Sequence, residues 1–184
     1  MKKFWNSYGL LLSVGGVIVL LDQVTKTLVR NDLMEGEMWS PWTWLLPYIR
    51  VVHIQNSGAA FGMLPGLSIV FTILSIIVVI AILYFFPRVP RQDWVLRLAL
   101  CLQFGGALGN LIDRLHQGYV TDFVSFMSFA VFNVADACIS IGVAILILDI
   151  WFKEKKKDTA TALKPAETSA ESSNNPSTKD LSGD

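Results

Sequence analysis

The residues best suited to chemistry in this sequence are aspartates and asparagines. Asp122 and Asp136 flank Asn133, and Asn110 comes four residues before Arg114. Two carboxyl groups held close together cannot both ionise easily, so such a pair shares one proton. The ionised member can take a proton from water while the protonated member polarises a peptide carbonyl. A pair of this kind performs the chemistry of an aspartic protease, which forms no covalent intermediate.

The residue types alone leave other chemistries open. Asp22 and Asp113 are further candidate carboxylates, and a carboxylate cluster can also bind a cation or carry protons. The only histidines, His53 and His116, have no serine, cysteine or metal-ligand pattern around them. A Ser-His site or a zinc site is therefore not expected.

Four apolar stretches must position these residues. Hydrophobic residues make up 53% of the 184-residue chain, and the mean hydropathy is +0.50. A membrane-spanning helix needs about 20 mostly apolar residues. Such stretches cover residues 8–29, 67–86, 94–112 and 131–152. The composition predicts a multi-pass, all-α membrane protein, and a net charge of zero gives no basic excess that would favour nucleic acid.

Basic residues indicate the direction of the four spans. They cluster at the N-terminus, between the second and third spans, and after the fourth. An even number of spans places these clusters on one side, which the positive-inside rule makes cytoplasmic. We therefore expect residues 1–157 to form one integral membrane domain with both termini in the cytoplasm. The polar residues 158–184 are expected to be a disordered tail.

In this orientation the polar residues fall at one depth, near the outer face of the membrane. They are Asp22, Lys26, Asn56, Asn110, Asp113, Arg114, Asp122, Asn133 and Asp136. Asp22 and Lys26 are four residues apart and can form a local ion pair. Asn110 and Arg114 share a helix face and are expected to hold an acidic partner rather than to react.

The loop between the first two spans contains a tryptophan cluster. Trp39, Trp42 and Trp44 suit the headgroup layer of a membrane. Residues 48–55 are rich in β-branched side chains and predict a strand. We therefore expect a small extracytoplasmic β-sheet that lies on the membrane. Its tryptophans serve either as an interfacial anchor or in a substrate role.

Five motifs, taken in order, resemble those of lipoprotein signal peptidase, also called signal peptidase II. They are LDQVTK (21–26), QNSGAAFG (55–62), GGALGNLIDR (105–114), GYVTDFVSF (118–126) and FNVADACISIG (132–142). The resemblance covers about residues 8–150, which include all four spans and both outer loops. Five motifs in order at these depths are far more specific than any one of them.

The resemblance implies a membrane aspartic endopeptidase with Asp122 and Asp136 as its catalytic residues. It further implies Asn56, Gly58, Asn110, Arg114 and Asn133 as residues that line the site, with Asp22 and Lys26 in support. Members of the family remove the signal peptide from diacylglyceryl-modified bacterial prolipoproteins, cutting just before the lipidated cysteine. The implied partners are these substrates and membrane lipid, without nucleic acid, metal or cofactor, and we expect a monomer in the bacterial cytoplasmic (inner) membrane.

Two other classes of protein remain as alternatives. A small ion-coupled transporter would use the carboxylates to bind its ion, but transport sites usually lie near the membrane midplane. A structural subunit would pack through Gly105 and Gly109, which form a GxxxG pattern typical of close helix contacts. The structural class leaves the Asp-Asn clusters unexplained.

Overall fold

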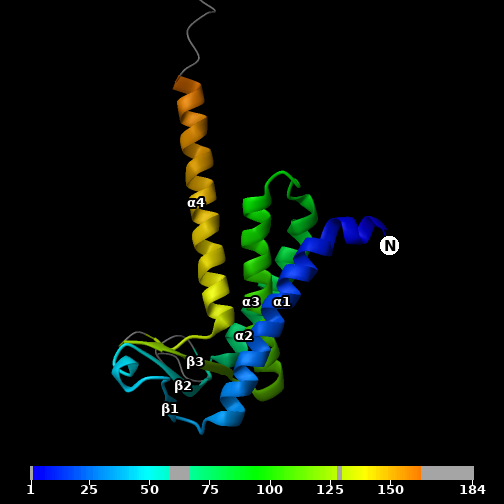
Figure 1. Cartoon of the computed structure of the whole chain (residues 1–184). Helices are drawn as coiled ribbons and strands as arrows, with labels where there is room; N and C mark the ends of the chain where they lie inside the picture. The colour runs from blue at the N-terminus through cyan, green and yellow to red at the C-terminus, as the bar shows by residue number, and fades with distance from the viewer. Residues whose placement is uncertain (1, 59–66, 128–129, 163–184) are drawn as a thin grey trace, which may run out of the picture. The chain divides into compact units, whose positions relative to one another are not determined.

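The computed structural model describes residues 2–58, 67–127 and 130–162 (Figure 1). Its elements are α1 (Lys2–Asp32), β1 (Met38–Trp39), η1 (Thr43–Leu45), β2 (Ile49–Asn56), α2 (Ser68–Phe85), η3 (Phe86–Arg88), α3 (Trp94–Gln117), β3 (Val120–Phe126) and α4 (Val134–Ala162). Four long helices and one small antiparallel sheet confirm the predicted class, an all-α membrane protein with a small β element.

The four long helices coincide with the four apolar stretches. The parts long and apolar enough to cross a membrane are Ser7–Asp32, Ser68–Arg88, Trp94–Gln117 and Val134–Lys156. Of these, 56% of the most apolar part of α3 is buried inside the protein, against 22% for α1 and 11% each for α2 and α4. The chain is a multi-pass membrane protein, and α3 is its central helix.

The end of α3 and the start of α4, which both lie close to the candidate site residues, differ from the prediction. α3 continues beyond residue 112 to Gln117, so Asp113 and Arg114 lie inside the helix. It ends at Gly118, whose φ of 82° is a left-handed conformation that glycine adopts without steric cost. α4 begins at Val134 rather than at residue 131, because the preceding segment pairs with β3. Hydropathy marks the apolar part of a helix, whereas backbone hydrogen bonds decide where it ends.

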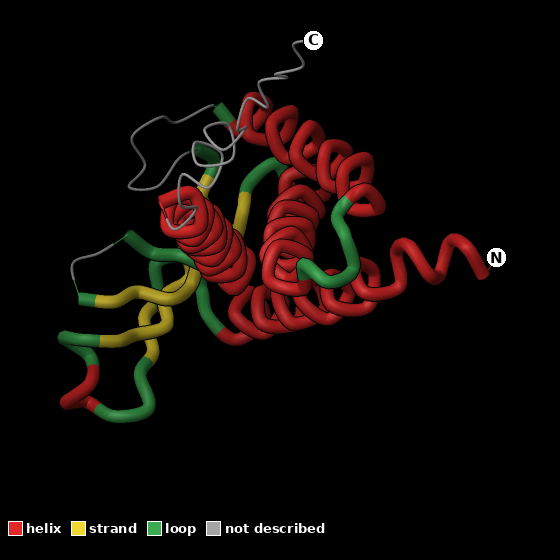
Figure 2. The backbone as a smooth tube through the Cα atoms, turned by 90° about the horizontal axis from the view of Figure 1, so that it is seen from above, coloured by secondary structure: helices red, strands yellow, loops and turns green. Residues whose placement is uncertain are grey.

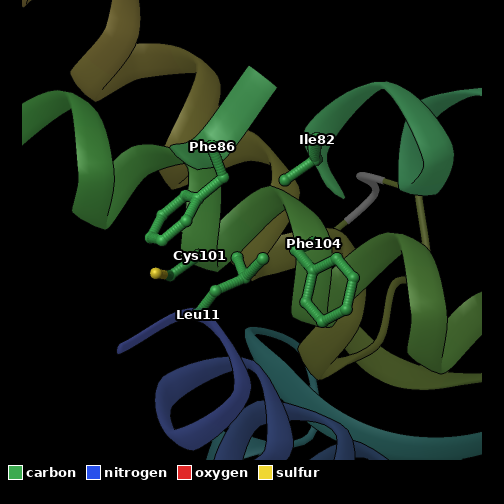
Figure 3. Packing of buried hydrophobic residues seen from close by; sticks show 5 residues of the cluster. All are labelled: Leu11, Ile82, Phe86, Cys101 and Phe104. Atoms are coloured by element: carbon green, nitrogen blue, oxygen red, sulfur yellow. The ribbon is translucent and has the colours of Figure 1, made fainter. Parts of the chain in front are cut away.

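An apolar cluster joins the first three helices. Its buried members are Leu11, Ile82, Phe86, Cys101 and Phe104, which come from α1, α2, η3 and α3 (Figure 3). Dispersion contacts and close packing, rather than water exclusion alone, must hold helices together where their outer faces are apolar. This cluster fixes α1 and α2 against the central helix.

Glycines allow α1 and α3 to approach closely. A Cβ atom on Gly105 would lie 2.7 Å from Cβ of Ile18, and one on Gly109 would lie 2.6 Å from the carboxylate of Asp22. Neither distance is tolerated by real side chains. The expectation that Gly105 and Gly109 form a packing face is confirmed, and the same contact brings Asp22 against α3.

The sheet has the strand order β1-β2-β3, with all pairs antiparallel. Figure 2 shows its strands running side by side. The strand predicted at 48–55 is β2, one residue further along the chain. In the pairing of β2 with β3, Ile54 lies opposite Asp122 and Asn56 lies opposite Val120. The ring of His53 bonds through Nδ1 to the carbonyl of Leu33 at 2.9 Å, which ties the sheet to the end of α1.

The chain divides into two compact units, Met1–Ile147 and Leu148–Asp184. All candidate site residues belong to the first unit. In the second unit α4 continues to Ala162, so the helix extends into the segment for which no structure was expected. Residues 163–184 of that segment lie outside the described residues, as do residues 59–62 of the second motif.

Candidate active site

Asp122 lies in β3 with both carboxylate oxygens hydrogen-bonded. The side-chain amide of Asn56 donates to Oδ2 at 2.8 Å, and that of Asn133 donates to Oδ1 at 2.7 Å. Antiparallel pairing of β2 with β3 brings Asn56 beside the aspartate. Only 3% of Asp122 is exposed, so these amide groups replace water around the carboxylate.

The amide of Asn56 is itself oriented by the following turn. The backbone N–H of Gly58 donates to Oδ1 of Asn56 at 3.0 Å. Since the carbonyl end of the amide is occupied in this way, its NH₂ end faces Asp122. Gly58, expected from the resemblance to line the site, therefore lies in contact with it through the backbone.

Asp136 lies in the first turn of α4 and forms a reciprocal cap with Asn133. The backbone N–H of Asp136 donates to Oδ1 of Asn133 at 2.9 Å, and the backbone N–H of Asn133 donates to Oδ2 of Asp136 at 3.2 Å. This is a capping box, placed where the helix dipole favours negative charge. Asn133 thus contacts both aspartates, Asp122 through its side chain and Asp136 through its backbone and side-chain oxygen.

A buried lysine lies behind the two aspartates. The ammonium of Lys26 lies 2.7 Å from Asp22 and 3.1 Å from Asp113, and it donates to Oδ1 of Asn110 at 2.9 Å. The amide of Asn110 then donates to Asp136 at 2.7 Å. The expected Asp22–Lys26 ion pair is present, and both side chains are fully buried. The lysine fixes which way the Asn110 amide points.

The carboxylates therefore differ in their partners. Asp22 and Asp113 share the cation of Lys26, whereas the partners found for Asp122 and Asp136 are amides. Burial, and then the nearby Asp136, raise the pKa of Asp122 to about 7, against a smaller lowering by its two amide bonds and by Lys26. Asp122 therefore keeps its proton to a higher pH than an ordinary aspartate does.

Three residues of the network were not singled out from the sequence. Gln23 donates to the carbonyl of Gly109 and to Asp113, both at 3.1 Å. Arg30 donates to the hydroxyl of Thr121 at 3.1 Å. The signal for Arg30 was present, because it follows Lys26 by four residues on the face already marked by Asp22. Gln23 and Thr121 are visible only as neighbours of marked residues.

A groove of about 920 Å³ opens onto both amide-bonded aspartates. Asn56, Gly58, Asn110 and Arg114 also line it. It continues between α2, α3 and α4, where most of the lining side chains are apolar, including Leu74, Val78, Ala107, Ile139 and Val143. The guanidinium of Arg114 lies 5.6 Å from the ring of Phe71 on the groove wall. Among the residues that the structure describes, no group of three or more His, Cys, Asp or Glu is placed to hold a metal ion.

Residues 14–152 match the family model described as signal peptidase II. A lipoprotein signal peptidase from Halothermothrix orenii is 39% identical over 146 residues, covering 77% of this chain and 95% of the relative. One from Staphylococcus aureus is 34% identical over 152 residues, covering 80% and 90%. The matched region contains every residue of the network described above.

Two solved structures share the fold. Both are bacterial membrane enzymes determined by the in meso method, at 2.3 and 1.9 Å resolution. The first has a TM-score of 0.73 at 32% identity and covers 86% of this chain and 94% of its own. The second has a TM-score of 0.69 at 33% identity, covering 77% and 92%.

Proposed function

Because the chain belongs to the signal peptidase II family, and so is a membrane peptidase that removes signal peptides from prolipoproteins, we propose that it does so with Asp122 and Asp136 as a water-activating pair. The cut falls just before a cysteine that already carries a diacylglyceryl group. The observation that carries this proposal is the groove that Asp122 and Asp136 line. The hydrogen-bond donors to these two carboxyl groups are amides rather than cations.

The pair performs the reaction by moving protons. The ionised carboxylate takes a proton from water as the water oxygen bonds to the scissile carbonyl carbon. The protonated carboxyl gives its proton to the carbonyl oxygen, so a tetrahedral diol forms. The C–N bond then breaks as a proton passes to the departing amine of the lipidated cysteine. One shared proton at neutral pH, favoured by the pKa of about 7 for Asp122, suits this cycle.

The surrounding residues hold the pair and the substrate. Asn56, Asn110 and Asn133 orient the two carboxyl groups, while Asp22 and Lys26 act through Asn110. Arg114 faces the groove, and its guanidinium makes no hydrogen bond to another residue in the described part of the chain. It is therefore available to a carbonyl or ester oxygen of the substrate.

We assign the site to the outer face of the bacterial cytoplasmic membrane, with both termini inside. The distribution of basic residues supports this orientation. Trp39, Trp42 and Trp44 are exposed by 54%, 59% and 67%, as expected for side chains in the headgroup layer. There they cover the bound lipid. Unchanged cleavage of a lipidated substrate after deletion of residues 39–44 would leave these tryptophans only an anchoring role.

Purified Asp122→Asn and Asp136→Asn variants test the catalytic pair. We expect cleavage of a diacylglyceryl-modified prolipoprotein, followed by gel shift, to slow by about 10²- to 10⁴-fold in each. Asp149→Asn is the matched control, because Asp149 pairs with Lys153 on α4 outside the site. Full activity in either site variant would overturn the pair, and no cleavage by the unaltered protein would overturn the function.

A further inference from the structure

Besides Ser75 of α2, two polar side chains lie deeper in the groove and take no part in the mechanism above. Gln103 of α3 and Ser140 of α4 both line it. Nε2 of Gln103 is buried and has no hydrogen-bond partner among the described residues. The hydroxyl of Ser140 has none there either. An unpaired polar group within a membrane span is costly, so it calls for a functional explanation.

These two residues repeat the arrangement of Asn110 and Asn133. Gln103 precedes Asn110 by seven residues, and Ser140 follows Asn133 by seven. Seven residues are close to two helical turns, so Gln103 lies on nearly the same face of α3 as Asn110, and Ser140 lies about two turns into α4 from its capping residue Asn133. At about 1.5 Å per residue, the deeper pair lies about 10 Å from the pair at the catalytic end.

Close packing of α3 on α4 keeps the deeper pair at one level. A Cβ atom on Gly142 would lie 3.0 Å from Cγ of Gln103 and 2.9 Å from the carbonyl oxygen of Ala99. The Gln103 side chain is held at its stem by this contact. Its terminal amide torsion is soft, and because Nε2 has no bond to lose, the amide is free to turn into the groove.

We propose that Gln103, assisted by Ser140, donates a hydrogen bond to a backbone carbonyl of the signal peptide about three residues before the scissile bond. The inference rests on the proposed function, since it deepens the use of the same groove. An extended chain advances about 3.3 Å per residue, so 10 Å corresponds to about three residues.

The chemistry of the substrate favours a carbonyl at that position. A signal peptide crosses the membrane as a helix, but its chain must leave the helix to reach the two aspartates. The last four carbonyls of a helix have no partner within it, and hydrocarbon offers them none. The ester carbonyls of the diacylglyceryl group are attached beyond the scissile bond, at the depth of Asp122 and Asp136. Depth therefore selects the peptide carbonyl over the lipid esters.

The test uses the full-length protein and three synthetic lipidated peptides. The first has an all-amide backbone and ester-linked lipid chains. The second has the same lipid and a backbone ester, which weakens the carbonyl three residues before the scissile bond as a hydrogen-bond acceptor. The third has an all-amide backbone and ether-linked lipid chains. The variants are Gln103→Leu and Ser140→Ala. Thr72→Val is the control, because the Thr72 hydroxyl bonds to the carbonyl of Ser68 in its own helix at 2.7 Å.

With the all-amide peptide we expect Gln103→Leu to lower kcat/KM about 3- to 10-fold, mainly by raising KM, while kcat stays near that of the unaltered protein. The backbone ester should cause a similar loss in the unaltered protein and little further loss in Gln103→Leu. Ser140→Ala should show a smaller effect, and Thr72→Val none.

The outcomes separate the inference from the function on which it rests. If the unaltered protein cleaves no peptide, the proposed function fails. If it cleaves them but Gln103→Leu behaves identically, the inference fails. If Gln103→Leu lowers kcat/KM for peptides with ester-linked lipid but not for the peptide with ether-linked lipid, the hydrogen bond goes to a lipid ester. That result would overturn the peptide assignment. If Gln103→Leu does not fold, the unaltered protein is tested with a series of peptides that carry a single backbone ester two, three, four or five residues before the scissile bond. The loss of kcat/KM must then be largest for the ester at position three, and any other result overturns the inference.

Discussion

Asp122 is the residue whose ionisation should set the alkaline limit of activity. Burial, and then the charge of Asp136, raise its pKa to about 7. A raised pKa means that the proton is retained up to neutral pH and lost above it, so the pair then loses its shared proton. We expect kcat/KM to fall as pH rises through about 7, measured with one lipidated substrate across buffers of constant ionic strength. A flat profile up to pH 9 would contradict this.

A variant of Asn56 tests whether the pKa of Asp122 sets the alkaline limit of activity. Its hydrogen bond to Asp122 favours the ionised form and lowers the pKa. Asn56→Leu should therefore raise the pKa and move the alkaline limb upward by about one pH unit. Gln55→Leu makes the same kind of change on an exposed neighbour in β2 and should leave the profile in place. A downward shift in Asn56→Leu would mean that the amide does not stabilise the carboxylate.

Loss of the Lys26 ammonium should lower the free energy of unfolding strongly, because its ion pairs are buried. Lys26→Met leaves the buried carboxylates of Asp22 and Asp113 without their cation, and it removes a donor from Asn110. Breaking a buried pair on one side costs about 3–5 kcal/mol. We expect the free energy of unfolding in detergent to fall by that amount.

Lys153→Met is the matched control for that experiment. Lys153 also pairs with an aspartate four residues away, Asp149, but its side chain is 53% exposed. An exposed pair contributes about 0–1 kcal/mol. Similar losses in the two variants would show that burial does not distinguish these lysines.

The sequence predicted which polar residues gather at one level, but it did not predict which aspartates pair with a cation and which with amides. Placement by depth brought Asp22, Asp113, Asp122 and Asp136 to one level, and all four lie in the network. Depth could not separate them, because the difference is made by Lys26, whose ammonium reaches across from α1 to α3. Such a choice of partners depends on helix packing, which spacing along one helix does not reveal.

Helix α3 is the element on which the site is built. Its glycines face two different neighbours, since Gly105 contacts α1, Gly106 contacts α4, and Gly109 lies against both helices. A Cβ atom on Gly106 would lie 2.5 Å from the carbonyl oxygen of Ala135, one residue before Asp136. Gly106 therefore controls the distance between the helices that present Asn110 and Asp136.

Gly106→Ala should consequently damage both stability and activity. The backbone of α4 must move to admit the methyl group, at a cost of about 1–3 kcal/mol, and Asp136 moves with it. Thermal unfolding and the cleavage rate measure the two effects. Gly16→Ala is the control, since nothing lies within 4 Å of a Cβ atom there. Normal cleavage by Gly106→Ala would show that the spacing of α3 and α4 is not critical.

Helix boundaries show what hydropathy misses. The start of α4 was placed at residue 131 from its apolar content, yet Asn133 and Asp136 have the spacing of a capping box. Giving that local signal more weight than hydropathy would have placed the start correctly. The segment before it is drawn into pairing with Val124 of β3, a contact that no local pattern reveals.

The site as a whole draws on five elements: α1, β2, α3, β3 and α4. Four apolar stretches were enough to predict the helices, and β-branched residues were enough to predict β2. The pairing of β2 with β3 was not predicted, although it brings Asn56 to Asp122 across 66 residues of sequence. Only contacts of this long range close the site around the carboxyl pair.

The orientation of the whole molecule gives a final prediction. If both termini lie inside, as we propose, the turn after α1 and the sheet face outward, and the loop between η3 and α3 faces the cytoplasm. Glu35 and Gln92 are exposed residues of these two regions. In a protein with Cys101→Ala and Cys138→Ala, a membrane-impermeant maleimide added to spheroplasts should label Glu35→Cys at once. It should label Gln92→Cys only after the membrane is permeabilised. The reverse pattern would place the aspartates on the cytoplasmic side, away from the leaflet that presents a lipidated cysteine, and would contradict the assigned orientation.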